Sequence, residues 1–202
     1  MSERETFMSA PQKTASYITP EGYLALEAAA EIKHEYVDGE IFAMTGVTRA
    51  HNIICLNLAA LLRDHLRGSR CQTFMAEVKL QVEAANCFFY PDLFVTCSEA
   101  DRANPLVQAE AKLVIEVLSE STALFDREGK FAAYRSLPSL AEYVLVRQDM
   151  MSIECYRRGD GGEWILHPYS EGETVRLHSL ELSFPIEAAY PDVDFGIAAA
   201  QT

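Results

Sequence analysis

The sequence predicts a mixed α/β (α+β) domain, with a restriction-endonuclease-like arrangement of a mixed sheet flanked by helices and an antiparallel C-terminal part. Three observations predict this class. Residues 113–118 are almost wholly apolar, as in a central strand, and segments on both sides carry apolar residues at helical spacing. Residues 151–184 alternate between apolar and polar runs separated by glycines, which predicts a β-meander. Strands combined with at least two long helices are typical of layered folds.

The first part of the chain supplies a helix, a hairpin and a second helix. Residues 20–33 are rich in Ala and Glu and begin with Pro20, which is favoured at the first position of a helix. Asp38-Gly39 lies between β-forming residues and predicts a two-residue hairpin of short antiparallel strands. Residues 49–67 carry apolar side chains at helical spacing and stop before Gly68, which predicts a long helix.

The middle of the chain supplies further strands and a third helix. Residues 74–82 alternate in the manner of a half-buried strand, and residues 88–96 form another predicted strand. Residues 122–137 are predicted to be helical until Pro138 ends the helix, and residues 142–146 form the next strand.

Length and composition predict one domain. The chain has 202 residues, of which 49% are hydrophobic, enough for a single core. We expect a domain at residues 20–191 between tails at residues 1–19 and 192–202. No apolar segment approaches the roughly 20 residues that span a bilayer, and the polar start does not resemble a signal peptide. We therefore expect a cytoplasmic protein without a membrane segment.

The cysteines give little indication of zinc or disulfides. They are odd in number and scattered, with no CxxC pair and no neighbouring histidine pair. We therefore expect ordinary half-buried thiols at all of them. They are Cys55, Cys71, Cys87, Cys97 and Cys155.

The net charge bears on any interaction with nucleic acid. The 17 Lys and Arg residues against 30 Asp and Glu leave a formal charge of −13, which weighs against tight non-specific DNA binding. A nuclease is still compatible with this charge, because carboxylates that hold a metal are acidic by necessity and the metal supplies the charge that faces phosphate.

Asp92 and Glu116 are the most informative residues, because each is a carboxylate within an apolar strand. A buried, unpaired carboxylate costs several kcal/mol, and two on neighbouring strands repel each other unless a cation lies between them or one is protonated. A divalent ion would resolve both penalties. The alternative is that each pairs with a buried Arg or Lys, or lies at a strand end in water. Pro91 lacks an N–H and favours a strand edge or bulge, where Asp92 can leave the regular sheet.

At these residues the chain resembles the PD-(D/E)XK nuclease superfamily and, within it, the large bacterial Uma-type family of restriction-endonuclease-like proteins. The resemblance spans roughly residues 17–191 and rests on short segments in a specific order. The segments are IKHEYVDGE at residues 32–40, YPDL at residues 90–93, LVIEVLSEST at residues 113–122, and Asp126, Lys130 and Tyr134 followed by Glu142-Tyr143.

The resemblance implies a Mg²⁺ site at Asp92 and Glu116, at which Mn²⁺ can substitute. The superfamily pattern places a lysine two residues after the second acid, but this chain has Leu118 there. Similar proteins supply that lysine from the next helix, where Lys130 is the matching position. Glu35 matches an acid near the N-terminal helix that acts as a third oxygen ligand or holds a metal-bound water; the alternative is a surface hairpin residue.

Three accessory candidates surround this set. Asp126, Lys130 and Tyr134 follow at intervals of four, so they share a helix face that can look toward the strand ends. Such a row by itself is more often a solvated salt-bridge face. His51 at the start of the second helix either faces the same cleft or is simply exposed.

Glu77-Val78-Lys79 is a literal match to the acid-x-lysine signature, but we reject it as the site. It precedes Asp92 instead of following it, and an alternating strand accounts for both charges as its solvent-facing side.

These residues predict a Mg²⁺-dependent endonuclease that hydrolyses phosphodiester bonds in DNA. The predicted catalytic residues are Glu35, Asp92, Glu116 and Lys130. Two alternatives remain. One is a binding or regulatory module that keeps the nuclease fold but no longer cuts, which the missing strand lysine and the negative charge favour. The other is a hydrolase of another phosphoester, such as RNA or a nucleotide. A homodimer is implied by resemblance to nucleases that cut both strands.

Aromatic residues in the last third have two explanations. Tyr156, Trp164 and Tyr169 belong to a dimer surface, since aromatic residues are enriched at interfaces, or they pack in the core of one chain.

Overall fold

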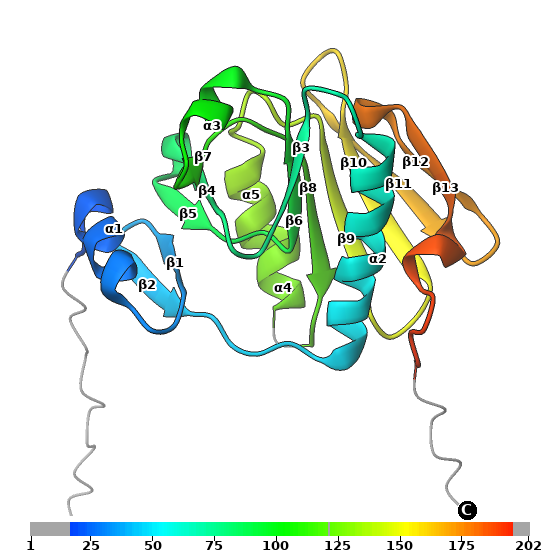
Figure 1. Ribbon diagram of the computed structural model, residues 1–202, viewed down its shortest axis with the longest axis horizontal. Helices are drawn as coiled ribbons and strands as arrows, with labels where there is room; N and C mark the ends of the chain where they lie inside the picture. The colour runs from blue at the N-terminus through cyan, green and yellow to red at the C-terminus, as the bar shows by residue number, and fades with distance from the viewer. Residues whose placement is uncertain (1–16, 121, 196–202) are drawn as a thin grey trace, which may run out of the picture.

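A six-stranded mixed sheet forms the centre of the computed structural model, which describes residues 17–120 and 122–195 (Figure 1). The strand order is β11-β10-β9-β8-β6-β3, and only β8 and β9 pair in parallel. The mixed sheet confirms the predicted fold class. Its strands are β3 (Gln72–Met75), β6 (Leu93–Thr96), β8 (Ala111–Leu118), β9 (Glu142–Arg147), β10 (Ser152–Arg158) and β11 (Trp164–Ser170).

A second sheet of five strands lies beside the N-terminal helix α1 (Pro20–Ala29) in Figure 1. The predicted hairpin is confirmed within it. Its turn residues Asp38 and Gly39 have φ angles of 44° and 97°, and two positive φ angles are what a type I′ hairpin turn requires. The strands, in the order β2-β1-β5-β4-β7, are β1 (His34–Val37), β2 (Glu40–Ala43), β4 (Lys79–Val82), β5 (Cys87–Phe89) and β7 (Val107–Gln108).

Helices cover the two faces of the central sheet. Helix α2 (Arg49–His65) packs on the face that carries Ile115 and Val117 of β8, while Val114 and Leu118 point to the other face. The predicted helix at residues 122–137 covers that second face as three consecutive pieces. They are α4 (Ala123–Phe125), a π-helical turn (Asp126–Lys130) and α5 (Phe131–Tyr134).

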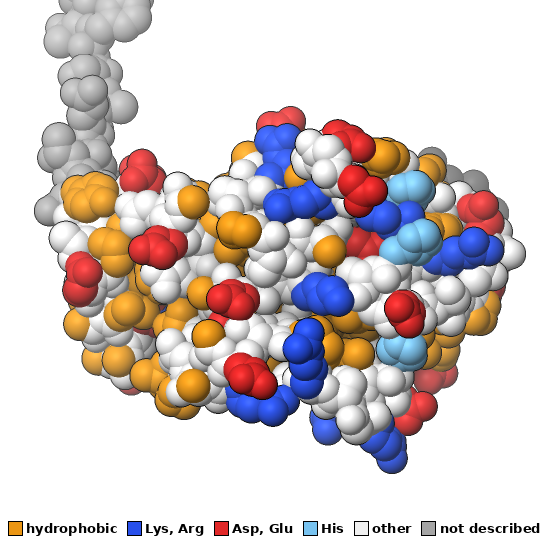
Figure 2. Space-filling model, turned by 90° about the horizontal axis from the view of Figure 1, so that it is seen from above, with side chains coloured by type: hydrophobic (Ala, Val, Ile, Leu, Met, Phe, Trp, Pro, Cys, Tyr) orange, Lys and Arg blue, Asp and Glu red, His pale blue; other side chains and the backbone are white. Residues whose placement is uncertain are grey.

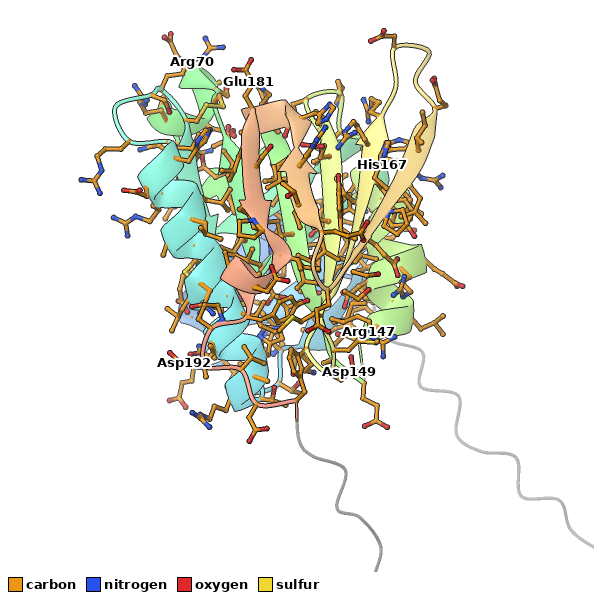
Figure 3. All side chains as sticks on the ribbon, turned by 90° about the vertical axis from the view of Figure 1, so that its right-hand side faces the viewer. Arg70, Arg147, Asp149, His167, Glu181 and Asp192 are labelled. Atoms are coloured by element: carbon orange, nitrogen blue, oxygen red, sulfur yellow. A yellow bond between two sulfur atoms is a disulfide. The ribbon has the colours of Figure 1, made fainter. Side chains whose placement is uncertain are left out.

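The last third is antiparallel, as predicted. Strands β12 (Thr174–Leu177) and β13 (Leu182–Pro185) form a separate two-stranded sheet that lies beside α2 on the same face of the central sheet (Figure 3). The rings of Tyr156 and Trp164 pack on Phe131, with centroid distances of 4.6 Å and 5.4 Å. Packing within the chain therefore accounts for these two aromatic residues. The remaining short helices are α3 (Glu99–Ala103) and the 3₁₀ turns Glu83–Ala85, His178–Leu180 and Ile186–Ala189.

The single strands predicted at residues 74–82 and 88–96 are wrong. Each divides into two strands that belong to different sheets: β3 and β4 in the first case, β5 and β6 in the second. The alternation of apolar residues is the same in both sheets, so the periodicity does not reveal where the chain crosses from one to the other. The second crossing, at residues 90–92, contains Pro91 and carries Asp92 directly before β6.

The expectation of free thiols is wrong for two cysteines, because Cys71 and Cys97 form a disulfide. The register explains the contact. Strands β3 and β6 are antiparallel neighbours in which Gln72 faces Thr96, so the residues just outside this pair meet at the end of the ladder. Cys55, Cys87 and Cys155 are buried thiols, as predicted.

The described part of the chain includes residues outside the expected domain bounds. Ile18 donates its N–H to the Gly39 carbonyl at 3.0 Å, and Phe195 packs on Tyr190 with a centroid distance of 5.5 Å. The other residues of the expected tails, 1–16 and 196–202, lie outside the described part of the chain. Within the described part, no helix has both the length and the apolar character needed to cross a membrane.

Candidate functional site

The connection from β2 to α2, which runs along the lower edge of the molecule in Figure 1, lines a pocket of about 720 Å³. All four residues predicted for catalysis line it, together with two of the three accessory candidates. The third, Tyr134, does not line the pocket: it is fully buried, and its hydroxyl donates to Glu116. The predicted residues that line the pocket are Glu35, His51, Asp92, Glu116, Asp126 and Lys130.

Asp92 and Glu116 meet at one edge of the central sheet. Strands β6 and β8 are antiparallel neighbours, so the residue that enters β6 lies beside the end of β8. The Asp92 N–H donates to Oε2 of Glu116 at 3.1 Å, and Oδ2 of Asp92 accepts the N–H of Val117 at 2.7 Å. Each carboxylate therefore accepts a backbone N–H from the segment that carries the other carboxylate.

Lys130 reaches the same point from the π-helical turn. Its Nζ lies 3.0 Å from Oε1 of Glu35, 3.3 Å from Oε1 of Glu116 and 3.4 Å from Oδ1 of Asp126. Burial tends to lower the pKa of Lys130, but the charges of these three carboxylates outweigh burial and raise the pKa above its ordinary value. Lys130 is therefore a charged ammonium at neutral pH.

The cluster has an excess of negative charge. Burial raises the pKa of Glu116 well above its ordinary value; Lys130 opposes the shift, whereas Asp92, Asp126 and Glu35 add to it. Burial likewise raises the pKa of Asp126, against the effect of Lys130. Oδ1 of Asp126 is buried, and its contact is the Lys130 ammonium at 3.4 Å. Three carboxylates thus contact one ammonium and Asp92 lies beside them, an arrangement that fits an additional cation.

Two tyrosines hold the carboxylates in place. The Tyr134 hydroxyl donates to Oε1 of Glu116 at 3.1 Å, and the backbone N–H of Tyr90 donates to Oε1 of Glu35 at 3.2 Å. Glu35 is buried in this cluster, so the interpretation of Glu35 as a surface hairpin residue is wrong. The contact of Tyr90 was not predicted, although Tyr90 lies in the segment that carries Asp92.

His51 is buried and faces the cleft, so the interpretation of an exposed histidine is wrong. Thr48 caps α2 by accepting the N–H of His51, which fixes this histidine in the first turn. Nε2 of His51 lies 3.1 Å from Oδ2 of Asp92, and Nδ1 lies 3.6 Å from Sγ of Cys55.

His51, Cys55 and Asp92 place three potential metal ligands within 4.8 Å of one another. The sequence did not predict this group, because Cys55 belongs to the apolar face of α2. Burial raises the pKa of the Cys55 thiol, and the charges of Asp92 and Glu116 add to the shift. The thiol is thus protonated at neutral pH, whereas a metal binds the thiolate. Asp92 belongs both to this group and to the carboxylate cluster.

Leu118 and Glu77 are the two residues that bear on the acid-x-lysine pattern. Leu118 occupies the strand position at which the superfamily pattern has a lysine, and it is buried in the apolar cluster under α5. Glu77 is exposed, pairs with Lys33 at 2.5 Å and does not line the pocket. The literal signature at residues 77–79 is therefore outside the cluster, as predicted.

Comparison with known proteins places the chain in a family. Residues 20–189 match the sequence profile of the Uma2 family, described as "Putative restriction endonuclease". "Uncharacterized protein slr1290" of Synechocystis sp. (strain ATCC 27184 / PCC 6803 / Kazusa) is 36% identical over 88% of this chain and 94% of its own length. "Uncharacterized protein sll1609" of the same organism is 33% identical over 76% of this chain and 88% of its own length.

A solved structure has the same fold. The crystal structure of a "putative nuclease belonging to DUF820" from Anabaena variabilis ATCC 29413 superposes with a TM-score of 0.71 at 17% sequence identity, over 86% of this chain and 97% of that one. At this identity the likeness concerns the fold. The match of the family profile over most of the chain, together with the two relatives, shows that the protein belongs to the Uma2 family.

Proposed function

We propose that this protein is a Mg²⁺-dependent endonuclease, also active with Mn²⁺, that hydrolyses phosphodiester bonds in DNA. The observation that carries the proposal is the convergence of Asp92 and Glu116, from two separate strands, with the Lys130 ammonium in one pocket. The description of the family and the fold of the related structure support the same reaction class.

The donor set of the pocket suits a hard divalent cation. Mg²⁺ prefers oxygen ligands and is bound through one or two carboxylates while it keeps several waters. Asp92 and Glu116 would hold it, and the surplus of carboxylates over ammonium groups supplies the compensating charge. When bound, the metal would acidify a coordinated water and neutralise charge on the phosphate.

The surrounding residues of this chain have separate tasks. Lys130 keeps its charge at neutral pH and can donate hydrogen bonds to the attacking water or to the non-bridging oxygens, where negative charge develops. Glu35 holds Lys130 at 3.0 Å and also faces the pocket. Tyr134 and His51 act as positioning residues, since each donates to or contacts one of the two metal-binding carboxylates.

Cleavage of plasmid and single-stranded DNA with Mg²⁺ or Mn²⁺ tests the proposal. Asp92→Ala, Glu116→Ala and Lys130→Ala should each lower the cleavage rate by about 100-fold or more, comparable to the loss of one group that stabilises transition-state charge. Glu77→Ala is the matched control, because it removes an acid of the literal signature that lies outside the pocket. Equal rates in all these proteins would end the catalytic assignment.

Calorimetry separates the proposal from the alternative of a binding module. A site with intact carboxylates should bind Mn²⁺ and lose it in Asp92→Ala, whereas an inert scaffold would take up no ion in either protein. Metal binding without cleavage of DNA, RNA or nucleotides would favour a regulatory module, and cleavage of RNA alone would change the substrate. A homodimer is also part of this proposal, and sedimentation gives its mass.

A further inference from the structure

Part of the pocket lining beside the carboxylates carries exposed apolar side chains. It is formed by the end of β2, by the connection to α2 and by Phe125 of α4. Phe42 is 49% exposed, Val47 is 58% exposed and Phe125 is 40% exposed. Large apolar side chains that are exposed together around a pocket are typical of a binding surface.

Phe125 is held in a defined position although its ring is partly exposed. Gly129 lacks a Cβ where the ring lies: a Cβ there would approach Cε2 of Phe125 to 2.5 Å. The Phe125 ring also makes a T-shaped contact with the Phe89 ring, with a centroid distance of 6.3 Å. Phe125 thus presents a fixed aromatic face to the pocket.

The pocket lacks the cations that a duplex requires. Among the described lining residues, Lys130 is the only lysine or arginine, and three carboxylates already neutralise it. Lys33 and Lys79 lie over the ring of the lining residue Tyr90 but do not line the pocket themselves. A protein that follows double-stranded DNA normally makes several phosphate contacts with Lys or Arg.

The other end of the sheet carries basic and acidic side chains side by side. Figure 2 shows that end, with Lys, Arg and His side chains among acidic ones. Arg157 there pairs with Glu142, which lies beside Leu113 at the start of β8, whereas Glu116 lies toward the end of β8. These basic side chains therefore lie away from the pocket.

We propose that the pocket binds an unpaired nucleotide of DNA, with its base stacked on Phe125 and Phe42 and its phosphate directed to the carboxylate cluster. This inference rests on the proposed nuclease function and gives its substrate class: single-stranded DNA or an unpaired segment of a duplex. Stacking on aromatic side chains tolerates any base and contributes about 1–3 kcal/mol per base, and Phe42 and Phe125 in the pocket lining offer such side chains.

Binding and cleavage are measured separately to test this inference. The probes are fluorescein-labelled thymidine oligonucleotides of about a dozen nucleotides, within the usual range of single-strand sites. One is single-stranded, one is the blunt duplex, and one is a single strand of abasic sugar-phosphates with the same charge. Polarisation is recorded with Ca²⁺ in place of Mg²⁺, and the probe is checked for integrity afterwards. Cleavage of the same strands is then measured with Mg²⁺.

The single strand should bind about fivefold or more tightly than either other probe, since one stacked base is worth at least this factor. Phe125→Leu and Phe42→Leu should remove most of the difference while both proteins keep the wild-type melting temperature. Leu124→Ala is the matched control, because Leu124 is 69% exposed on the same helix but does not line the pocket.

Two results would overturn the inference: a duplex that binds as tightly as the single strand, or leucine variants that bind the single strand like the wild type. Cleavage of duplex in the first case would leave the nuclease proposal intact. Phenylalanine-dependent binding of the single strand without cleavage in Mg²⁺ or Mn²⁺ would support the nucleotide pocket and overturn only the catalytic proposal.

Discussion

Nζ of Lys130 lies 3.3 Å from Oε1 of Glu116, and both groups are almost completely buried. The lysine comes from a π-helical turn and the glutamate from the central strand β8, so the ion pair joins the helix layer to the sheet. The same ammonium also contacts Glu35 and Asp126. It is the only cation in contact with these three acids among the described residues.

Replacing Lys130 by Met should therefore lower both stability and activity. Removing one partner of a buried ion pair leaves uncompensated charge and costs about 3–5 kcal/mol. Protonation of Glu116 can recover part of this cost, since its pKa is already raised by burial. The free energy of unfolding in urea measures the first effect and DNA cleavage the second. A variant with wild-type stability would show that the pair is not needed for folding.

Stability without metal should fall as the pH rises above the ordinary carboxyl value of 4.5. Burial raises the pKa of Glu116 well above that value, so the folded protein binds more protons than the unfolded chain in this range. The contribution of Glu116 is fully present below 4.5 and is lost as the pH rises through its raised pKa. Asp126 acts in the same direction. Urea unfolding at a series of pH values measures the slope.

A divalent ion should weaken this decline of stability with rising pH. The metal binds ionised carboxylates, so its affinity increases with pH and it stabilises the folded state more at neutral than at acidic pH. Mn²⁺ should therefore flatten the decline, as should Glu116→Gln in the absence of metal. A decline that is unchanged by Mn²⁺ and by this variant would assign the pH dependence to other groups.

His51→Ala should weaken Mn²⁺ binding by about 10-fold to 100-fold, because residues that orient a metal-binding carboxylate have effects of this size. His51 lies 3.1 Å from Asp92, which we propose as a ligand. Calorimetric titration measures the affinity. His65→Ala is the control on the same helix. The His65 ring contacts the Leu180 carbonyl, and His65 does not line the pocket. Equal losses in both variants would indicate a general effect on α2.

Reduction of the Cys71–Cys97 disulfide should lower the free energy of unfolding by up to about 3 kcal/mol, as expected from the 26-residue separation of the two cysteines. Urea unfolding with and without reductant measures the change, and Cys97→Ser should behave like the reduced protein. Thiol titration in denaturant provides an independent check: three groups should react before reduction and five after it. Five reactive groups in the unreduced protein would contradict the bridge.

Local sequence determined the elements and the residue types of the cluster. Carboxylates at Asp92 and Glu116 within apolar strands, and an acid, a lysine and a tyrosine spaced by four, are local patterns that hold wherever the segments lie in the fold. The Asp38-Gly39 turn is equally local, because it depends on the φ angles of two residues.

Tertiary structure decided which of these local features meet. The crossings between the two sheets follow from strand pairing. The Cys71–Cys97 contact joins residues 26 positions apart, and the contact of His51 with Asp92 joins residues 41 positions apart. The place of Phe125 in the same pocket lining as Phe42 is likewise set by the packing of distant segments. Periodicity in a sequence reports which face of an element is apolar, and it contains no information on the register or the partner that this face will find.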